Sequence, residues 1–299
     1  MFYWMLKFVL IGPLLRMIFR PWVEGAENVP ADGPAILASN HLSYSDWLFM
    51  PLVIPRRVTF VAKAEYFEGR GVKGWFQRTF FSGAGQVPID RTGGRASEGA
   101  LRAGMRILRQ GGLFGIFPEG TRSHDGRLYK GRTGVARLAL QSGVPVVPVA
   151  LSGTDEIAPP GRILRKITSP TVRFGVPLDF SRYAGMESDR MVLRTITDEI
   201  MYAIMELSGQ TYVDEYAPSA KEKSRQEQIR AVQQWIEARR PRRDGGGDPA
   251  AEDPAPCDTA PDDIPPGDAA PDDAAPDDAG PDDAVPGAGP DGTDPTRPA

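Results

Sequence analysis

Short apolar runs alternate with amphipathic stretches along the first two thirds of the chain. Each run is long enough for one buried strand, and the runs cover residues 35–39, 57–62, 85–90, 113–117, 144–151 and 171–175. The stretches between them predict helices, which begin near Ser43 and then cover the region up to Phe81, residues 97–110 and residues 133–142. Strands that alternate with helices are typical of an α/β domain, so we predict a largely parallel central sheet flanked by helices.

Two further helices and a biased tail follow. Residues 187–208 repeat apolar side chains at 192, 196, 200 and 204, which predicts an amphipathic helix that ends at Gly209. Residues 219–240 predict a charged helix. From Asp244 onward the chain consists mainly of Pro, Ala, Gly and Asp, and this composition predicts disorder because it offers too little apolar surface to offset the entropy of ordering.

The tail hides the charge of the rest of the chain. Residues 244–299 hold 16 acidic residues and one basic residue, whereas residues 1–243 hold 34 basic and 23 acidic residues, a net charge of +11. A basic domain suits anionic lipid surfaces, phosphorylated substrates or nucleic acid. Solubility alone is the simpler explanation of such a charge.

Residues 1–22 are strongly apolar but include Lys7, Arg16 and Arg20, with Pro13 between them. The uncharged run, residues 8–15, is shorter than the ~18 residues that a spanning helix needs, and the segment lacks the features of a signal peptide. We predict a helix that associates with the membrane surface. A helix that covers the domain's own core is the alternative.

His41 and Asp46 lie where the first buried strand gives way to a helix. Five residues separate them, so their side chains meet only across a turn. Ser43 and Asp46 also match the capping-box pattern, in which Asp46 would do no more than cap the helix. A carboxylate in the first helical turn can cap the helix and also orient a histidine that acts as a general base. The spacing alone leaves catalysis and capping open.

Two other strand ends carry polar clusters. The segment FPEGTRS, residues 117–123, offers an arginine and accessible backbone amides to a phosphate, and Arg127, Lys130 and Arg132 follow it. The segment VPIDR ends at Arg91. A solvated turn and a surface salt bridge are the simpler explanations of these two segments.

Other chemistries find less support. The segment GRGVKG, residues 69–74, matches a dinucleotide-binding fingerprint, but six residues separate it from the preceding strand. The chain has no Walker loop and no G-x-S-x-G elbow. Two histidines and one cysteine make a zinc site improbable, and we expect no metal.

Taken together, the segments NHLSYSD, VPIDR, FPEGTRS and VPVVPVAL resemble the four sequence blocks of the glycerolipid acyltransferase family, most closely those of bacterial 1-acylglycerol-3-phosphate acyltransferases. The resemblance covers about residues 20–180. It implies that His41 is the general base and that Asp46 orients it. It also implies an acceptor-phosphate site formed by Arg91, Glu119, Gly120, Thr121, Arg122, Lys130 and Arg132. Lys130 and Arg132 stand where one basic residue is expected, so the cation that faces the phosphate stays open.

The implied reaction moves an acyl chain from acyl-CoA or acyl carrier protein to the free hydroxyl of 1-acylglycerol 3-phosphate and gives phosphatidate. The thioester is already activated, so we expect no cofactor. The expected partners are membrane lipids and the acyl donor, with no nucleic acid, and the expected location is the cytoplasmic face of the membrane. The alternatives are another lipid acceptor (glycerol phosphate, an aminolipid or a glycolipid) or a non-catalytic membrane-binding module. We divide the chain into a membrane-associating segment (1–22), an acyltransferase domain (23–210), a charged helical extension (211–243) and a disordered tail (244–299).

Overall fold

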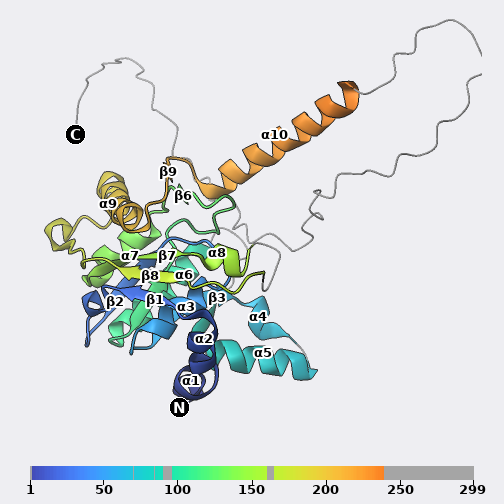
Figure 1. Ribbon diagram of the computed structural model, residues 1–299. Helices are drawn as coiled ribbons and strands as arrows, with labels where there is room; N and C mark the ends of the chain where they lie inside the picture. Colours follow the sequence, from blue (N-terminus) through green and yellow to red (C-terminus); the bar gives the residue numbers. More distant parts are fainter. Residues whose placement is uncertain (1, 70, 84, 90–95, 160–164, 239–299) are drawn as a thin grey trace, which may run out of the picture.

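The computed structural model describes residues 2–69, 71–83, 85–89, 96–159 and 165–238. Arg91 and the tail 244–299, for which the sequence predicts a phosphate contact and disorder, lie outside these residues. A seven-stranded sheet forms the centre of the molecule (Figure 1). Its strands, in spatial order, are β1 (Trp22–Glu24), β8 (Thr171–Phe174), β7 (Val146–Ser152), β2 (Ala35–Ser39), β5 (Leu113–Ile116), β3 (Val58–Lys63) and β4 (Gln86–Ile89).

The sheet confirms the predicted α/β architecture. Each neighbouring pair of strands is parallel except β7 and β8, which are antiparallel. The central strand β2 is buried along its whole length. Its side chains alternate between the faces of the sheet, so that Ala35 and Leu37 join one apolar cluster and Ile36 and Ala38 join the other.

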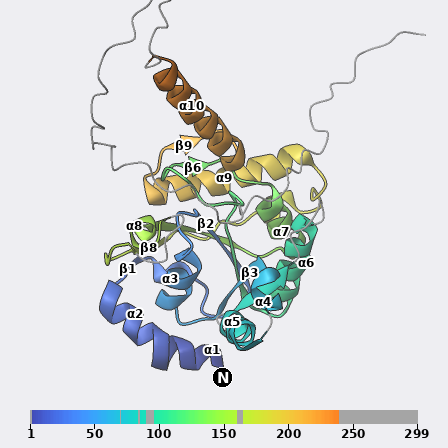
Figure 2. The same cartoon turned by 90° about the vertical axis from the view of Figure 1, so that its right-hand side faces the viewer.

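Helices cover both faces. α6 (Ala96–Arg109), α7 (Gly134–Ser142) and α9 (Arg190–Ser208) pack on the face that Ile36 points to. On the other face lie α3 (Asp46–Val53), α8 (Thr154–Ile157) and the N-terminal helical segment, and Figure 2 shows α9 and α3 on opposite sides of the sheet. α4 (Glu65–Glu68) and α5 (Gly71–Gly83) connect β3 to β4, and two short 3-10 turns cover Ala26–Asn28 and Ser181–Tyr183. The predicted end of α9 is confirmed, since Gly209 adopts a left-handed conformation with φ of 70°.

The N-terminal segment is helical from Phe2 to Phe19. It consists of α1 (Phe2–Met5), a π-helical stretch (Leu6–Leu10) and α2 (Ile11–Phe19). One face packs inward, with Tyr3 and Phe19 buried, while the other face exposes large apolar side chains. The helix therefore covers part of the core, as the alternative interpretation expected, and it also presents an apolar surface, so membrane association stays a prediction.

The charges of this helix turn toward the protein. The Lys7 ammonium donates to the carbonyls of Ile54 and Arg56, and the Arg16 guanidinium donates to the carbonyl of Leu52. These carbonyls lie at the C-terminal end of α3, where a helix leaves acceptors unpaired. The apolar helix is therefore longer than the uncharged run of residues 8–15. By length and composition, Phe2–Phe19 meets the criterion for a helix that could cross a membrane. Core helices of soluble proteins and signal sequences meet the same criterion.

A second, two-stranded parallel sheet pairs β6 (Leu128–Tyr129) with β9 (Tyr212–Val213). Each strand has only two residues, which is too short to leave a pattern in the sequence. After β9 the chain enters α10 (Ala217–Ala238), which projects away from the body of the molecule (Figures 1 and 2).

Candidate active site

The end of β2 is fixed by the side chain of Asn40. This side chain is fully buried, its amide nitrogen donates to the carbonyl of Leu151 and its oxygen accepts the backbone N–H of the same residue. Asn40 thus replaces the hydrogen bonds that a continued strand would make with β7, and the chain can turn immediately after it. His41 is the first residue of that turn.

His41 and Asp46 meet across this turn. Nδ1 of His41 lies 2.8 Å from Oδ2 of Asp46, and the same carboxylate oxygen accepts the backbone N–H groups of Leu42 and Ser43 at 2.7 and 2.9 Å. Asp46 has no exposed surface. The contact with the carboxylate favours the tautomer that carries its proton on Nδ1.

The predicted capping box forms only in part, because α3 begins at Asp46 and its N-cap residue Ser45 makes no side-chain capping bond. The Ser43 hydroxyl accepts the backbone N–H of Ser45 at 3.1 Å, while Asp46 accepts the N–H of Ser43 in return. The hydroxyl of Ser43 also donates to the carbonyl of Ala158, next to α8. One oxygen of Asp46 therefore holds the turn before α3 and also contacts His41, whereas the expected side-chain cap of the helix is absent.

The segment FPEGTRS wraps around His41 from the other side. The imidazole ring stacks on the ring of Phe117 with 4.0 Å between ring centroids. The backbone N–H of His41 donates to Oε1 of Glu119 at 3.0 Å, and its carbonyl accepts from the backbone N–H of Ser123 at 2.8 Å. The side chain of His41 keeps 18% of its surface exposed, and no residue in the described part of the chain hydrogen-bonds Nε2. That nitrogen is the atom available for proton transfer.

Glu119 itself is 1% exposed. Its second oxygen accepts the backbone N–H of Tyr129 in β6 at 2.9 Å. Burial raises the pKa of its carboxyl to about 8, because the low-dielectric surroundings disfavour the charged form more than the two N–H donors favour it.

Gly120 brings a cation to the same loop. The glycine has a φ of 77°, and a Cβ atom added to it would lie 3.0 Å from Nε of Arg132. The backbone N–H of Arg132 donates to the carbonyl of Pro118 at 2.8 Å, so the start of α7 and the loop are fixed together. Thr121 and Arg122 are half-buried in this loop.

Residues 20–152 match the sequence model of a family described as acyltransferase. This part of the chain is therefore similar to acyltransferases. It is 38% identical over 140 residues to the chloroplastic 1-acyl-sn-glycerol-3-phosphate acyltransferase LPAT1 of Arabidopsis thaliana, a match that covers 46% of this chain and 38% of the relative. It is 35% identical to the 1-acyl-sn-glycerol-3-phosphate acyltransferase alpha of Homo sapiens, over 46% of this chain and 47% of that protein. The chain thus spans less than half the length of these curated relatives.

A solved structure is also similar. The crystal structure of the 1-acyl-sn-glycerophosphate acyltransferase PlsC from Thermotoga maritima superimposes with a TM-score of 0.51 and 28% identity, over 66% of this chain and 76% of that chain. The predicted resemblance to acyltransferases and the predicted fold are therefore confirmed.

The structure places the predicted site residues differently. His41 and Asp46 are in contact, and Gly120, Thr121 and Arg122 lie on the loop whose neighbouring residues contact His41. Glu119 was expected to contact the acceptor phosphate, but both of its oxygens accept main-chain N–H groups inside the protein. It therefore holds His41 and β6 in place and is not turned outward toward a phosphate. Arg91 lies outside the described residues, although β4, the strand that precedes it, runs parallel to β3 at the edge of the sheet.

Sequence reasoning missed two contacts of the candidate site. Phe117 stacks on His41 and, on its other side, on Phe60, whose ring occupies the space that a side chain at Gly115 would fill. Lys130 forms an ion pair with Asp214, far outside the four blocks. The aromatic residue at the end of β5 was a usable signal, whereas nothing near Lys130 in the sequence points to Asp214.

Proposed function

We propose that this chain is a 1-acylglycerol-3-phosphate O-acyltransferase, which moves an acyl chain from acyl-CoA or acyl carrier protein to the free hydroxyl of 1-acylglycerol 3-phosphate and gives phosphatidate. One observation carries the proposal: Nδ1 of His41 contacts the buried carboxylate of Asp46, while none of the residues that the structure describes hydrogen-bonds Nε2. The names of the curated relatives support the choice of acceptor.

The proposed chemistry is a single acyl transfer. Nε2 of His41 accepts the proton of the acceptor hydroxyl while that oxygen attacks the thioester carbonyl, and the Asp46 carboxylate stabilises the imidazolium that forms. Collapse of the tetrahedral intermediate breaks the C–S bond, and the imidazolium returns its proton to the leaving thiolate. The products are the ester and a free thiol. The reaction needs neither a metal nor a cofactor, because the thioester supplies the driving force.

The acceptor's phosphate is assigned to the cations and amides beside this dyad. Gly120, Thr121 and Arg122 lie on the loop that encloses His41, and Arg132 reaches the same loop over Gly120. Guanidinium groups suit phosphate because they donate two parallel hydrogen bonds. Arg91 belongs to this assignment by its place in the second block, and Glu119 supports the site through the backbone of His41.

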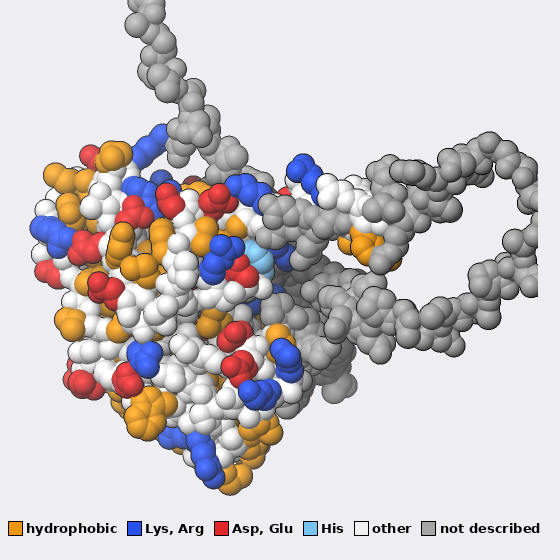
Figure 3. Space-filling model, turned by 45° about the horizontal axis from the view of Figure 1, so that its top comes forward, with side chains coloured by type: hydrophobic (Ala, Val, Ile, Leu, Met, Phe, Trp, Pro, Cys, Tyr) orange, Lys and Arg blue, Asp and Glu red, His pale blue; other side chains and the backbone are white. Residues whose placement is uncertain are grey.

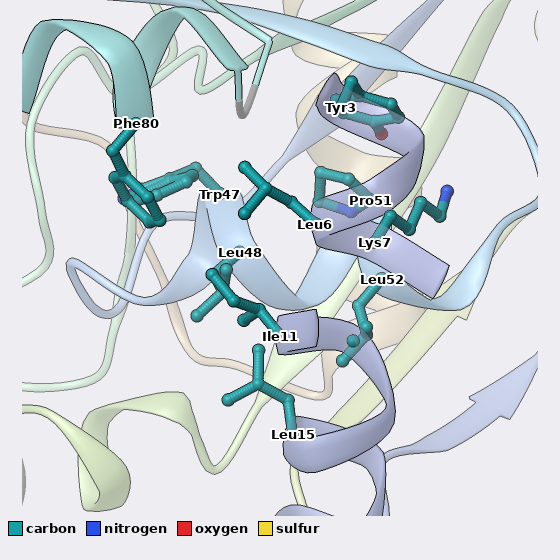
Figure 4. Close-up of a pocket in the computed structure, with 11 residues that line it drawn as sticks. Tyr3, Leu6, Lys7, Ile11, Leu15, Trp47, Leu48, Pro51, Leu52 and Phe80 are labelled. Carbon is teal, nitrogen blue, oxygen red and sulfur yellow. The ribbon is translucent and has the colours of Figure 1, made fainter. Parts of the chain in front are cut away.

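An apolar pocket next to α3 suits an acyl chain. It lies between the N-terminal helix, α3 and α5, as Figure 4 shows. Trp47, which directly follows Asp46, and Phe80 form one wall, and Leu6, Ile11 and Leu15 form the opposite wall. A hydrocarbon chain gains about 0.8 kcal/mol for each methylene buried in such surroundings.

The exposed face of the N-terminal helix supports a position at the membrane. Its exposed apolar side chains are Phe2, Trp4, Met5, Phe8, Val9, Leu10, Leu14, Met17 and Ile18. Apolar side chains of this size on one helix face bind the interface between headgroups and acyl chains. We assign the protein to the cytoplasmic face of the membrane, as a peripheral or monotopic enzyme.

The test is an assay of the purified full chain with 1-acylglycerol 3-phosphate and acyl-CoA or acyl carrier protein, in which thiol release is followed. Turnover is expected for the wild type and for His124→Ala, which changes the chain's other histidine. His41→Ala is expected to lose ~10²–10⁴-fold in kcat. If the wild type is inactive on lysophosphatidate but active on another lysolipid, the proposed acceptor is wrong. If it is inactive on every acceptor, the alternative of a non-catalytic membrane-binding module is favoured.

A further inference from the structure

The segment 210–216, which we call the strap, lies across the acyltransferase domain although it falls outside the matched residues 20–152. It follows α9 and contains β9, which pairs with β6. The backbone N–H of Leu128 donates to the carbonyl of Thr211, and that of Lys130 donates to the carbonyl of Glu215, both at 3.0 Å. The strap is therefore fixed along the segment that carries Lys130.

At its start the strap contacts the residue before His41. Oε1 of Gln210 accepts from the side-chain amide of Asn40 at 2.7 Å, and Nε2 of Gln210 donates to the carbonyl of Gly126 at 2.6 Å. One side chain thus joins the end of β2 to the loop that follows the third block. The strap reaches two of the elements that form the candidate site.

At its end the strap contacts both candidate cations. The ring of Tyr216 lies 5.7 Å from Cζ of Arg132 and 5.9 Å from Nζ of Lys130. Asp214 lies 2.9 Å from Nζ of Lys130. Figure 3 shows that acidic and basic side chains are interspersed over one face of the molecule.

Lys130 and Arg132 differ in the partners that the strap offers them. Lys130 has a carboxylate partner in Asp214, whereas no carboxylate in the described part of the chain lies within 4.0 Å of the Arg132 guanidinium. An aromatic face holds a guanidinium in place without neutralising it. Arg132 therefore keeps its charge and its hydrogen-bond donors available to an anion.

We propose that the strap selects Arg132 as the cation that meets the acceptor's phosphate, with Tyr216 as the positioning residue for Arg132 and Asp214 as the carboxylate that holds Lys130 away. The proposal rests on the proposed function. It answers which of the two basic residues after the third block faces the substrate, and it extends the acceptor site to a part of the chain beyond the family match.

The experiment measures binding and turnover separately in the full chain. Binding of a short-chain 1-acylglycerol 3-phosphate, soluble as a monomer, is followed by calorimetry, and turnover by thiol release. Tyr216→Ala is expected to raise Kd and the acceptor KM about two- to five-fold, the equivalent of a partly exposed cation–π contact, while kcat and the donor KM stay unchanged. Tyr216→Phe keeps the ring and is expected to restore the wild-type values.

Two further variants separate positioning from general damage. In an Arg132→Ala background, Tyr216→Ala is expected to cause no additional loss, because the two side chains act through one contact. Asp214→Asn is expected to tighten binding at low salt and to steepen its salt dependence, because it releases the charge of Lys130. Tyr183→Ala is the matched control, since Tyr183 stacks on Arg182 with 4.7 Å between guanidinium and ring, outside the strap.

The proposal is overturned if Tyr216→Ala and Tyr216→Phe behave alike, if Tyr216→Ala weakens binding equally without Arg132, or if the wild type does not bind the short-chain acceptor. If the variants change Kd as expected but the wild type shows no turnover, the proposed role of the strap is supported and the proposed acyltransferase function is overturned. If the wild type turns over and Tyr216→Ala leaves Kd unaltered, only the proposed role of the strap is overturned.

Discussion

The carboxylate of Glu119 holds the backbone of His41, with 3.0 Å between Oε1 and the backbone nitrogen. Its other oxygen holds the backbone of Tyr129. One buried side chain therefore joins the candidate general base to β6, the strand on which the strap is paired. A residue of the third sequence block therefore fixes the backbone of the first block.

Glu119 predicts a pH dependence of stability. Its pKa is about 8 in the folded protein, above the ordinary value of 4.5, because the carboxyl is buried. The folded state then binds a proton that the unfolded state releases, so the stabilisation is complete below pH ~4.5 and is lost as the pH rises toward 8. We expect the free energy of unfolding to fall by a few kcal/mol over this window, measured by urea denaturation. Glu119→Gln should remove the slope, and an equal slope in that variant would contradict the assignment.

Much of this fold was predictable because each central strand is a separate apolar run. The contact between His41 and Asp46 was predictable too, since the capping pattern at Ser43 is local and places the carboxylate by itself. The structural role of Glu119, which holds the backbones of His41 and Tyr129, was not predictable from the sequence. In the sequence it stands in a polar loop, and its burial depends on N–H donors that lie 78 residues before it and 10 residues after it. The contact of Gln210 with Asn40 joins residues 170 positions apart, and no local pattern can encode such a contact.

Asp46→Asn separates orientation from capping. Asparagine keeps an oxygen that can accept the backbone N–H groups of Leu42 and Ser43, so the turn before α3 and the melting temperature should change little. It lacks the charge that stabilises an imidazolium, and we expect kcat to fall ~10²–10⁴-fold. Asp189→Asn is the matched control, because Asp189 caps α9 through the N–H groups of Met191 and Val192. Equal kcat values in the two variants would show that Asp46 acts only as a cap.

The exposed face of the N-terminal helix predicts membrane binding by apolar contact. Val9 and Met17 are 68% and 67% exposed. We expect Val9→Ser combined with Met17→Ser to weaken sedimentation with anionic vesicles about tenfold or more, because each side chain contributes on the order of 1.5–3 kcal/mol when buried. Val176 and Met191, which are 73% and 75% exposed on other elements, provide the control pair. If both double variants bind alike, the helix is not the anchor.

Gly120→Ala tests whether the loop leaves room for Arg132. The positive φ of 77° costs an alanine about 1–2 kcal/mol, and its Cβ would lie 3.0 Å from Nε of Arg132, so the guanidinium has to move. Gly126→Ala has a similar φ of 80° but no heavy atom within 4 Å of the new Cβ, so it reports the backbone cost alone. We expect both variants to lose similar stability in thermal unfolding, and only Gly120→Ala to raise the acceptor KM, by several-fold. A shared rise in KM would trace the effect to loop strain, and a rise confined to Gly120→Ala would place Arg132 at the substrate.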